Sequence, residues 1–151
     1  QRALRAFPSG QDEPYPHGVI DCPPSLSRLT ITACAAATKV LLPVQCEYDT
    51  LEGVTQLLDT IERIRAHLNP SLELSTVLLT MYDGRTLLSK QVADEVRAHF
   101  GDTVLDSIIP RTVRISEAPG FGQTVIAYDP NSPGALAYRE AAAEIARRGA
   151  A

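Results

Sequence analysis

From Val19 onward, short apolar runs alternate with longer stretches whose apolar residues recur every three or four positions. Short runs such as Val40 to Val44 suit strands that are buried on both faces, and the longer stretches are typical of amphipathic helices. Strands that alternate with helices build a parallel sheet. The sequence therefore predicts an α/β fold in three layers, with a mostly parallel sheet flanked by helices.

The expected elements follow from this periodicity. Strands are expected at 19–22, 39–44, 74–80, 107–110 and 125–127. Helices are expected at 26–36, 50–68, 87–100 and 134–147. Residues 1–18 are rich in proline and glycine, which interrupt regular structure, and predict a linker or a frayed helix end. Residues 19–148 are expected to form the folded domain.

The amino-acid composition excludes several classes of function. The net charge of -4 argues against a surface that binds nucleic acid everywhere, so that any DNA contact must be a local patch. The absence of tryptophan and an aromatic content of 5% disfavour a surface that stacks single-stranded bases. No apolar run is long enough to span a bilayer and the start shows no signal-peptide pattern, so a cytoplasmic protein without membrane contact is expected.

Asp21 ends the first apolar run and is followed by Pro23 and Pro24. Open α/β sheets bind their ligands at the carboxyl ends of the strands. A carboxylate there can hold the water shell of a magnesium ion that bridges nucleotide phosphates. The alternative is that Asp21 caps the following helix.

Three arginines follow two further predicted strands. Arg85 comes after the strand at 74–80, and Arg111 and Arg114 come after the strand at 107–110, so all three should emerge at one edge of the sheet. A guanidinium group is suited to phosphate oxygens. The alternative is that each arginine pairs with a nearby carboxylate such as Asp83 or Glu117, because surface ion pairs are common and weak.

Five segments, taken in order, resemble the ParA/Soj family of chromosome- and plasmid-partitioning ATPases, which are P-loop NTPases with a deviant Walker A loop. The segments are Ile-Asp-Cys-Pro-Pro-Ser-Leu at 20–26, Leu-Pro-Val-Gln-Cys-Glu-Tyr at 42–48, Leu-Thr-Met-Tyr-Asp-Gly-Arg-Thr at 79–86, Ile-Pro-Arg-Thr-Val-Arg-Ile-Ser-Glu-Ala-Pro at 109–119 and Tyr-Asp-Pro-Asn-Ser-Pro-Gly-Ala at 128–135. The resemblance extends from about Tyr15 to Ile145 and corresponds to the C-terminal part of a family member.

The resemblance implies ATP and Mg²⁺ as cofactors, a homodimer that sandwiches ATP, DNA binding without sequence preference on the nucleoid, and a ParB-type partner that stimulates hydrolysis. Asp21 matches the Walker B aspartate, which contacts magnesium through water. Thr80, Pro110 and Arg111 match positions at the adenine end of the nucleotide pocket. Arg85 and Arg114 match positions implicated in DNA binding.

Departures from the family pattern bear on activity. The chain contains no glycine-rich loop ending in Gly-Lys-Thr or Gly-Lys-Ser, so a partial P-loop NTPase fold without the P-loop strand is expected. The family's usual asparagine is replaced at Thr32, Leu87 and Thr112. Without the loop, the triphosphate loses its main electrostatic partners. Catalysis by this chain alone is therefore not expected.

Two functions stay open, and a third is disfavoured. The chain is either part of a partitioning ATPase or a non-catalytic module that binds DNA or a partner. A division-site positioning or metal-cluster scaffold ATPase is disfavoured, because such relatives lack the Ser-Glu-Ala-Pro block present at 116–119. In addition, residues 141–151 carry too little bulky apolar surface for a membrane-targeting helix.

Calorimetric titration of this chain with MgATP should give no measurable binding, because the sequence contains no phosphate-binding loop. Binding at micromolar concentration would contradict this prediction and would show that another part of the chain holds the phosphates.

Overall fold

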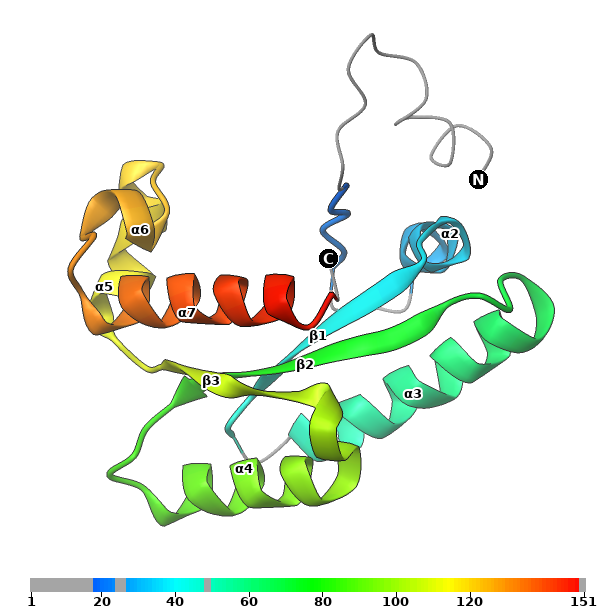
Figure 1. Ribbon diagram of the computed structural model, residues 1–151, viewed down its shortest axis with the longest axis horizontal. Coiled ribbons are helices and arrows are strands. Elements are labelled where there is room, and N and C mark those ends of the chain that lie inside the picture. Colours follow the sequence, from blue (N-terminus) through cyan, green and yellow to red (C-terminus); the bar gives the residue numbers. More distant parts are fainter. Residues whose placement is uncertain (1–17, 24–26, 48–49, 150–151) are drawn as a thin grey trace, which may run out of the picture. The chain divides into compact units, whose positions relative to one another are not determined.

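The computed structural model describes residues 18–23, 27–47 and 50–149. The expected linker, residues 1–18, lies outside this part except for Gly18. Two compact units divide the chain, one formed by Gln1–Val40 and Gly53–Leu74 and the other by Leu41–Glu52 and Ser75–Ala151. Figure 1 shows the elements in chain order.

The first unit contains α2 (Arg28–Ala36) and most of α3 (Thr50–His67). Ser27 caps α2, its hydroxyl accepting a hydrogen bond from the Thr30 amide at 3.5 Å. The core consists of apolar side chains from both helices and from the segments that follow them, which are Ile61, Ile64 and Leu72 with Ile31, Cys34, Ala37, Val40 and Leu57. Both helices confirm the elements expected at 26–36 and 50–68.

The buried side chain of Asn69 caps the C-terminal end of α2. Its side-chain amide donates to the carbonyl oxygens of Cys34 at 3.0 Å and Ala37 at 2.7 Å. These carbonyls lie at the helix terminus, where no intrahelical donor remains for them. Asn69 therefore supplies the donors that the end of the helix lacks.

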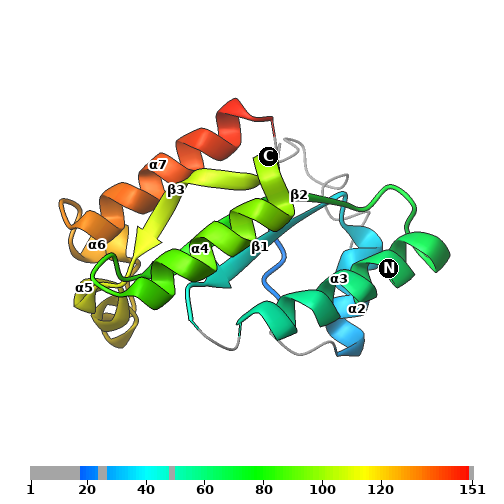
Figure 2. The same cartoon turned by 90° about the horizontal axis from the view of Figure 1, so that it is seen from below.

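The sheet contains three strands in the order β1 (Lys39–Gln45), β2 (Glu73–Tyr82) and β3 (Val104–Pro110). β2 pairs in parallel with β3, and Figure 2 shows β1 running in the same direction. In the central strand β2 the four residues from Thr76 to Leu79 are all buried, as expected for a strand covered on both faces. The predicted α/β fold with a parallel sheet is confirmed.

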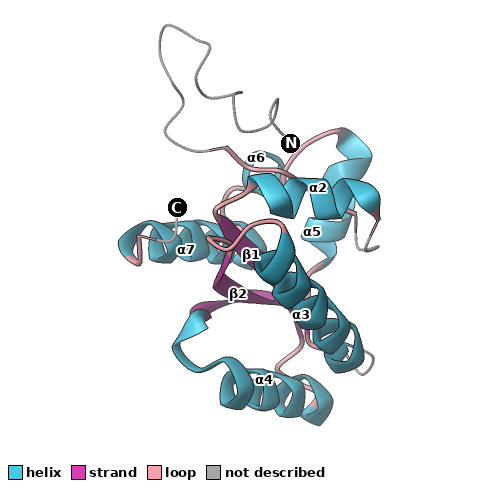
Figure 3. Cartoon of the chain, turned by 90° about the vertical axis from the view of Figure 1, so that its right-hand side faces the viewer, coloured by secondary structure: helices cyan, strands magenta, loops and turns pink. Residues whose placement is uncertain are grey.

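Within the second unit, helices cover both faces of the sheet. α7 (Pro133–Arg147) lies on one face and α4 (Leu87–Phe100) on the other (Figures 1 and 3). The α7 side is packed by side chains from β2, β3 and α7, which are Leu78, Leu105, Ile109, Ala137 and Ala141. On the α4 side, Val92, Ala93 and Val96 are buried. This arrangement gives the three layers that the sequence predicts.

Three short helical turns occupy most of the segment between β3 and α7. It contains α5 (Val113–Glu117), a 3₁₀ turn at Ala118–Phe121 and α6 (Val125–Tyr128). Gly134, near the start of α7, allows close packing against this segment, because a β-carbon there would lie 2.8 Å from the Ile115 side chain.

Two predicted strands are wrong. Residues 125–127 belong to α6, because the Thr124 hydroxyl accepts the Ala127 amide at 3.3 Å and caps a helical turn. Residues 19–22 are not in a strand, and Val19 is 95% exposed. A strand needs a hydrogen-bonded neighbour, and the sheet in the described part of the chain consists of β1 to β3 alone. β3 also begins at Val104, before the expected Ser107.

Glu144 on α7 fixes an irregular part of β3. From the pair Val77–Val104 to the pair Leu79–Ile108, β3 advances by four residues while β2 advances by two. The Glu144 carboxylate accepts the amides of Asp106 at 2.8 Å and Ser107 at 2.9 Å. The side chain of Glu144 is 6% exposed. The carboxylate therefore accepts hydrogen bonds from β3 amides that the irregular pairing with β2 leaves without an acceptor.

The ionised form of Glu144 is stabilised. Burial alone would raise its pKa, but hydrogen bonds from Ser107 and from the Asp106 amide, together with the charge of Arg148 at 2.5 Å, lower the pKa to about 2 from 4.5. A depressed carboxylate pKa contributes stability above the unfolded-state value. This contribution is lost as the pH falls from 4.5 towards 2.

Glu144→Gln is expected to lower the free energy of unfolding by about 3 kcal/mol at neutral pH, because Arg148 and the β3 amides lose a buried charged acceptor. Urea unfolding followed by circular dichroism measures this, with Glu140→Gln on the exposed surface of α7 as the control. The difference between wild type and Glu144→Gln should shrink below pH 4.5. Equal unfolding midpoints for the two variants would contradict the role of Glu144.

Candidate functional site

The carboxyl ends of the three strands meet at one edge of the second unit. The Cys46 amide, after β1, donates to the Thr80 carbonyl at 2.9 Å, and the Arg111 amide, after β3, donates to the Tyr82 carbonyl at 2.8 Å. Both bonds attach a loop to the end of the central strand. The loops that follow β1, β2 and β3 are thus neighbours, at the place where open α/β sheets bind ligands.

The end of β2 carries a bulge. Between the pairs Leu79–Ile108 and Tyr82–Pro110, β2 advances by three residues and β3 by two. Met81 accommodates the extra residue with a φ of 55°, in the left-handed region. Residues other than glycine rarely adopt this backbone conformation, and such backbone strain is found most often at functional sites. The bulge is therefore a second indication, independent of the sequence motifs, that this edge of the sheet is a candidate functional site.

Thr80 and Pro110, predicted at the adenine end of a nucleotide pocket, both lie at this edge. The half-buried Thr80 hydroxyl donates to the Val44 carbonyl at 3.3 Å. Pro110 is the last residue of β3 and is also half-buried. Since the hydroxyl oxygen keeps a lone pair when it donates, Thr80 can still accept a hydrogen bond from a ligand.

Arg111 forms an ion pair with Glu47. Glu47 follows β1 and Arg111 follows β3, so the pair joins the loops on either side of the end of β2. Half of the Arg111 side chain is exposed, as is 46% of the Glu47 side chain. The sequence analysis did not identify Glu47 as a partner of Arg111, because the contact depends on strand order. Its signal was an acidic residue directly after a strand.

Arg85 forms a bidentate ion pair with Asp83 through two parallel hydrogen bonds. Nε donates to Oδ1 at 2.9 Å and Nη2 donates to Oδ2 at 2.8 Å. The side-chain bond from Arg85, with its backbone amide and its charge, lowers the pKa of Asp83 to about 2. The Arg85 side chain is 89% exposed, so the guanidinium is paired yet fully accessible to solvent.

Buried Ser89, on α4, connects this arginine loop to β1. Its hydroxyl donates to the Cys46 carbonyl at 3.1 Å and accepts the Asp83 amide at 3.3 Å. Thr86 caps α4, its hydroxyl accepting the Ser89 amide at 3.3 Å. The Arg85 loop is thereby fixed to the sheet.

Arg114, on α5, pairs with two carboxylates. Nη1 donates to Glu117 at 3.0 Å, and Nε lies 3.4 Å from Asp129. The guanidinium lies 6.0 Å from the centre of the Tyr128 ring. The hydrogen bond that Arg114 donates to Glu117, together with the nearby charges, raises the pKa of Arg114 above its usual value. All three predicted arginines therefore form the carboxylate pairs that the sequence offered as the alternative to phosphate binding.

Asp21 belongs to the other unit, formed by Gln1–Val40 and Gly53–Leu74. It is exposed and follows a segment without regular secondary structure in place of the expected strand. The cap of α2 is Ser27, which removes the alternative that Asp21 caps this helix. An exposed carboxylate fits a magnesium ion held through water, since Mg²⁺ keeps several waters in nucleotide sites. Within the described residues, no three His, Cys, Asp or Glu side chains cluster as metal ligands.

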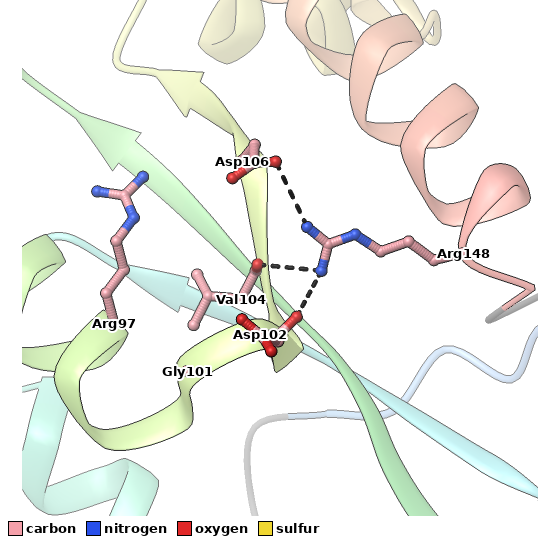
Figure 4. A pocket seen from close by; sticks show the side chains of 6 residues that line it. All are labelled: Arg97, Gly101, Asp102, Val104, Asp106 and Arg148. Atoms are coloured by element: carbon pink, nitrogen blue, oxygen red, sulfur yellow. Dashed lines mark hydrogen bonds and ion pairs between the residues drawn. The ribbon is translucent and has the colours of Figure 1, made fainter.

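A pocket of about 350 Å³ lies at the opposite end of β3 (Figure 4). Its lining includes Arg97 from α4, Asp106 and Arg148. Arg148 donates to the carbonyls of Asp102 at 2.5 Å and Val104 at 3.2 Å. These bonds, with the Glu144 contact, give Arg148 a structural role at the beginning of β3. None of the predicted functional residues is among those that line this pocket.

Comparison with known proteins places this fold among ATPases. A family model described as an AAA domain matches residues 9–74. A structure of cobyrinic acid a,c-diamide synthase from Mycobacterium smegmatis with bound ADP and magnesium aligns with a TM-score of 0.67 and 37% identity, over 87% of this chain and 46% of that chain. The Pyrococcus furiosus cell division ATPase MinD aligns with a TM-score of 0.73 over 97% of this chain and 58% of that chain. At 23% identity, MinD supports the fold alone.

Relatives with similar sequences identify the family within this fold. The chromosome partitioning protein ParA of Caulobacter vibrioides is 56% identical over 135 residues, covering 89% of this chain and 51% of the relative. The chromosome-partitioning ATPase Soj of Thermus thermophilus is 55% identical over 138 residues, covering 91% of this chain and 55% of the relative. The chain thus spans about half the length of the curated relatives that it matches.

The parallel sheet flanked by helices defines an α/β fold shared with the synthase that binds ADP and magnesium and with MinD. The identity to curated partitioning proteins then specifies the group within this fold. The chain belongs to the ParA/Soj family of chromosome-partitioning ATPases, as the five sequence segments predict.

Proposed function

We propose that this chain contributes the DNA-facing part of a ParA-type partitioning ATPase. The proposal rests on the 56% identity to a chromosome partitioning protein, together with Arg85 in the loop after β2 and Arg114 on α5, which follows the neighbouring parallel strand β3. Both side chains are more than half exposed. DNA binding of this kind is electrostatic and independent of sequence, because the arginines contact phosphates. It suits a protein of net charge -4 whose basic contacts are confined to one edge.

The nucleotide part of the proposal concerns Asp21, Thr80, Pro110 and Arg111. Structural neighbours contain ADP or an ATP analogue with magnesium, which supports the same cofactors for the ATPase to which this chain contributes. Asp21 would hold magnesium through water, and the other three would border the nucleotide base. In that ATPase, Asp21→Asn should weaken nucleotide binding only when magnesium is present. Equal weakening without magnesium would contradict the assignment.

The remaining parts of the proposal follow from the same family. They are an ATP-dependent homodimer, a ParB-type partner that stimulates hydrolysis, and a cytoplasmic location on the nucleoid. None of the helices in the described part of the chain has the length and apolar character that a bilayer span requires. Sedimentation of the whole ATPase to which this chain contributes, with and without ATP, tests the dimer, and a sedimentation coefficient that ATP leaves unchanged would contradict it.

DNA binding is tested by fluorescence anisotropy with a random-sequence duplex at several salt concentrations. Arg85→Ala and Arg114→Ala should each weaken binding and reduce the salt dependence by about one phosphate contact. Arg147→Ala removes the same charge from the exposed end of α7 and serves as the control. An equal loss in all three variants would indicate a general charge effect and would contradict a DNA-binding edge.

A further inference from the structure

Arg114 is held by groups from two helical elements. Glu117 lies one turn further along α5, and Asp129 ends α6 as its C-terminal cap. Glu117 engages Nη1 at 3.0 Å, and Asp129 lies 3.4 Å from Nε. Both carboxylates are accessible, with side-chain exposures of 40% and 37%. The arginine thus has one competing anion at each end of its guanidinium group.

Tyr128 contacts both Glu117 and the Arg114 guanidinium. The Tyr128 hydroxyl donates to Glu117 at 3.5 Å, and the Tyr128 ring stacks on Phe121 with centroids 5.0 Å apart and an angle of 21° between the planes. The same tyrosine ring faces the Arg114 guanidinium at 6.0 Å. The carboxylates, Tyr128 and Phe121 therefore form a preformed setting for the guanidinium, which we term the Arg114 cradle.

The cradle limits how Arg114 can meet a phosphate. A guanidinium binds phosphate most strongly through two parallel N–H donors. One of these donors is on Nη2, and the other is on Nε or on Nη1. In the described part of the chain, the Arg114 guanidinium donates a hydrogen bond to a carboxylate from Nη1, and Nη2 donates none. A phosphate that binds through two donors therefore has to use Nη1 or Nε together with Nη2, so that it competes with Glu117 or Asp129 for a nitrogen that the carboxylate already approaches.

We propose that Glu117 and Asp129 are positioning residues that compete with DNA phosphates for Arg114 and thereby set the affinity of this edge for DNA. The inference rests on the proposed function, in which Arg114 contacts phosphate. The local charge supports it, since one arginine faces two carboxylates and the cradle is negative overall. Exposed ion pairs are weak, so a phosphate group can displace one of them.

The test uses Glu117→Gln and Asp129→Asn, which keep the side-chain shape and remove the charge. Each should strengthen binding of a random-sequence duplex about two- to fivefold, as expected for loss of an exposed ion pair. Each should also steepen the dependence of the logarithm of affinity on the logarithm of salt concentration, by up to about one unit. Glu95→Gln, on the exposed surface of α4, removes the same charge away from the cradle and should leave the slope unchanged.

The outcomes separate this inference from the proposed function. If Arg114→Ala weakens DNA binding while Glu117→Gln and Asp129→Asn bind as wild type or more weakly, the competition is disproved and DNA contact by Arg114 stands. If Arg114→Ala binds as wild type, or wild type does not bind, both proposals fail. NMR of the Arg114 Nε–H group adds a test without DNA, since Asp129→Asn should shift this signal and Glu95→Gln should not. An unmoved signal would also overturn the cradle.

Discussion

Two backbone hydrogen bonds organise the candidate site, from Cys46 to Thr80 and from Arg111 to Tyr82. They continue the sheet beyond its regular strands and attach the outer loops to the end of β2. Parallel pairing alone brings strand ends to the same edge, but these bonds also fix the loops that follow. The bulge at Met81 lies between the two acceptor carbonyls, so the strained residue and the attached loops form one feature.

Charge pairing is the second property of this edge. Each of the three arginines has a carboxylate partner, with Asp83, Glu47 and Glu117 serving Arg85, Arg111 and Arg114. Exposed pairs of this kind contribute little to stability, because solvent screens them and ordering the side chains costs entropy. Their main consequence is for ligand binding. An anion that approaches the edge meets arginines whose positions are already restricted and whose charges are largely balanced.

Much of the fold could be predicted from the sequence, because periodicity and helix caps are local signals. The helix at 87–100 has the predicted bounds, with Thr86 and Gly101 at its ends. The strands predicted at 19–22 and 125–127 are wrong, since a strand depends on a partner that a short apolar run does not reveal. Such a run forms a helix when a capping residue such as Thr124 precedes it.

The candidate site was predictable in part. The arginines follow strands and therefore reach the predicted edge, and the pairing of Arg85 with Asp83 and of Arg114 with Glu117 is local in sequence. The partners Glu47 and Asp129 were missed, because their contacts depend on strand order and on the packing of α5 against α6. Glu144 was also missed, since its role arises from the irregular register of β3.

Mapping of amide chemical-shift changes during titration with duplex DNA locates the DNA contact without any mutation. If Arg85 and Arg114 contact DNA, the changes concentrate at the strand-end edge, in residues 83–86 and 111–117, and are small around Arg97 and Arg148 at the opposite end of β3. Changes concentrated around Arg97 and Arg148 would show that DNA binds elsewhere and that the strand-end edge does not bind it.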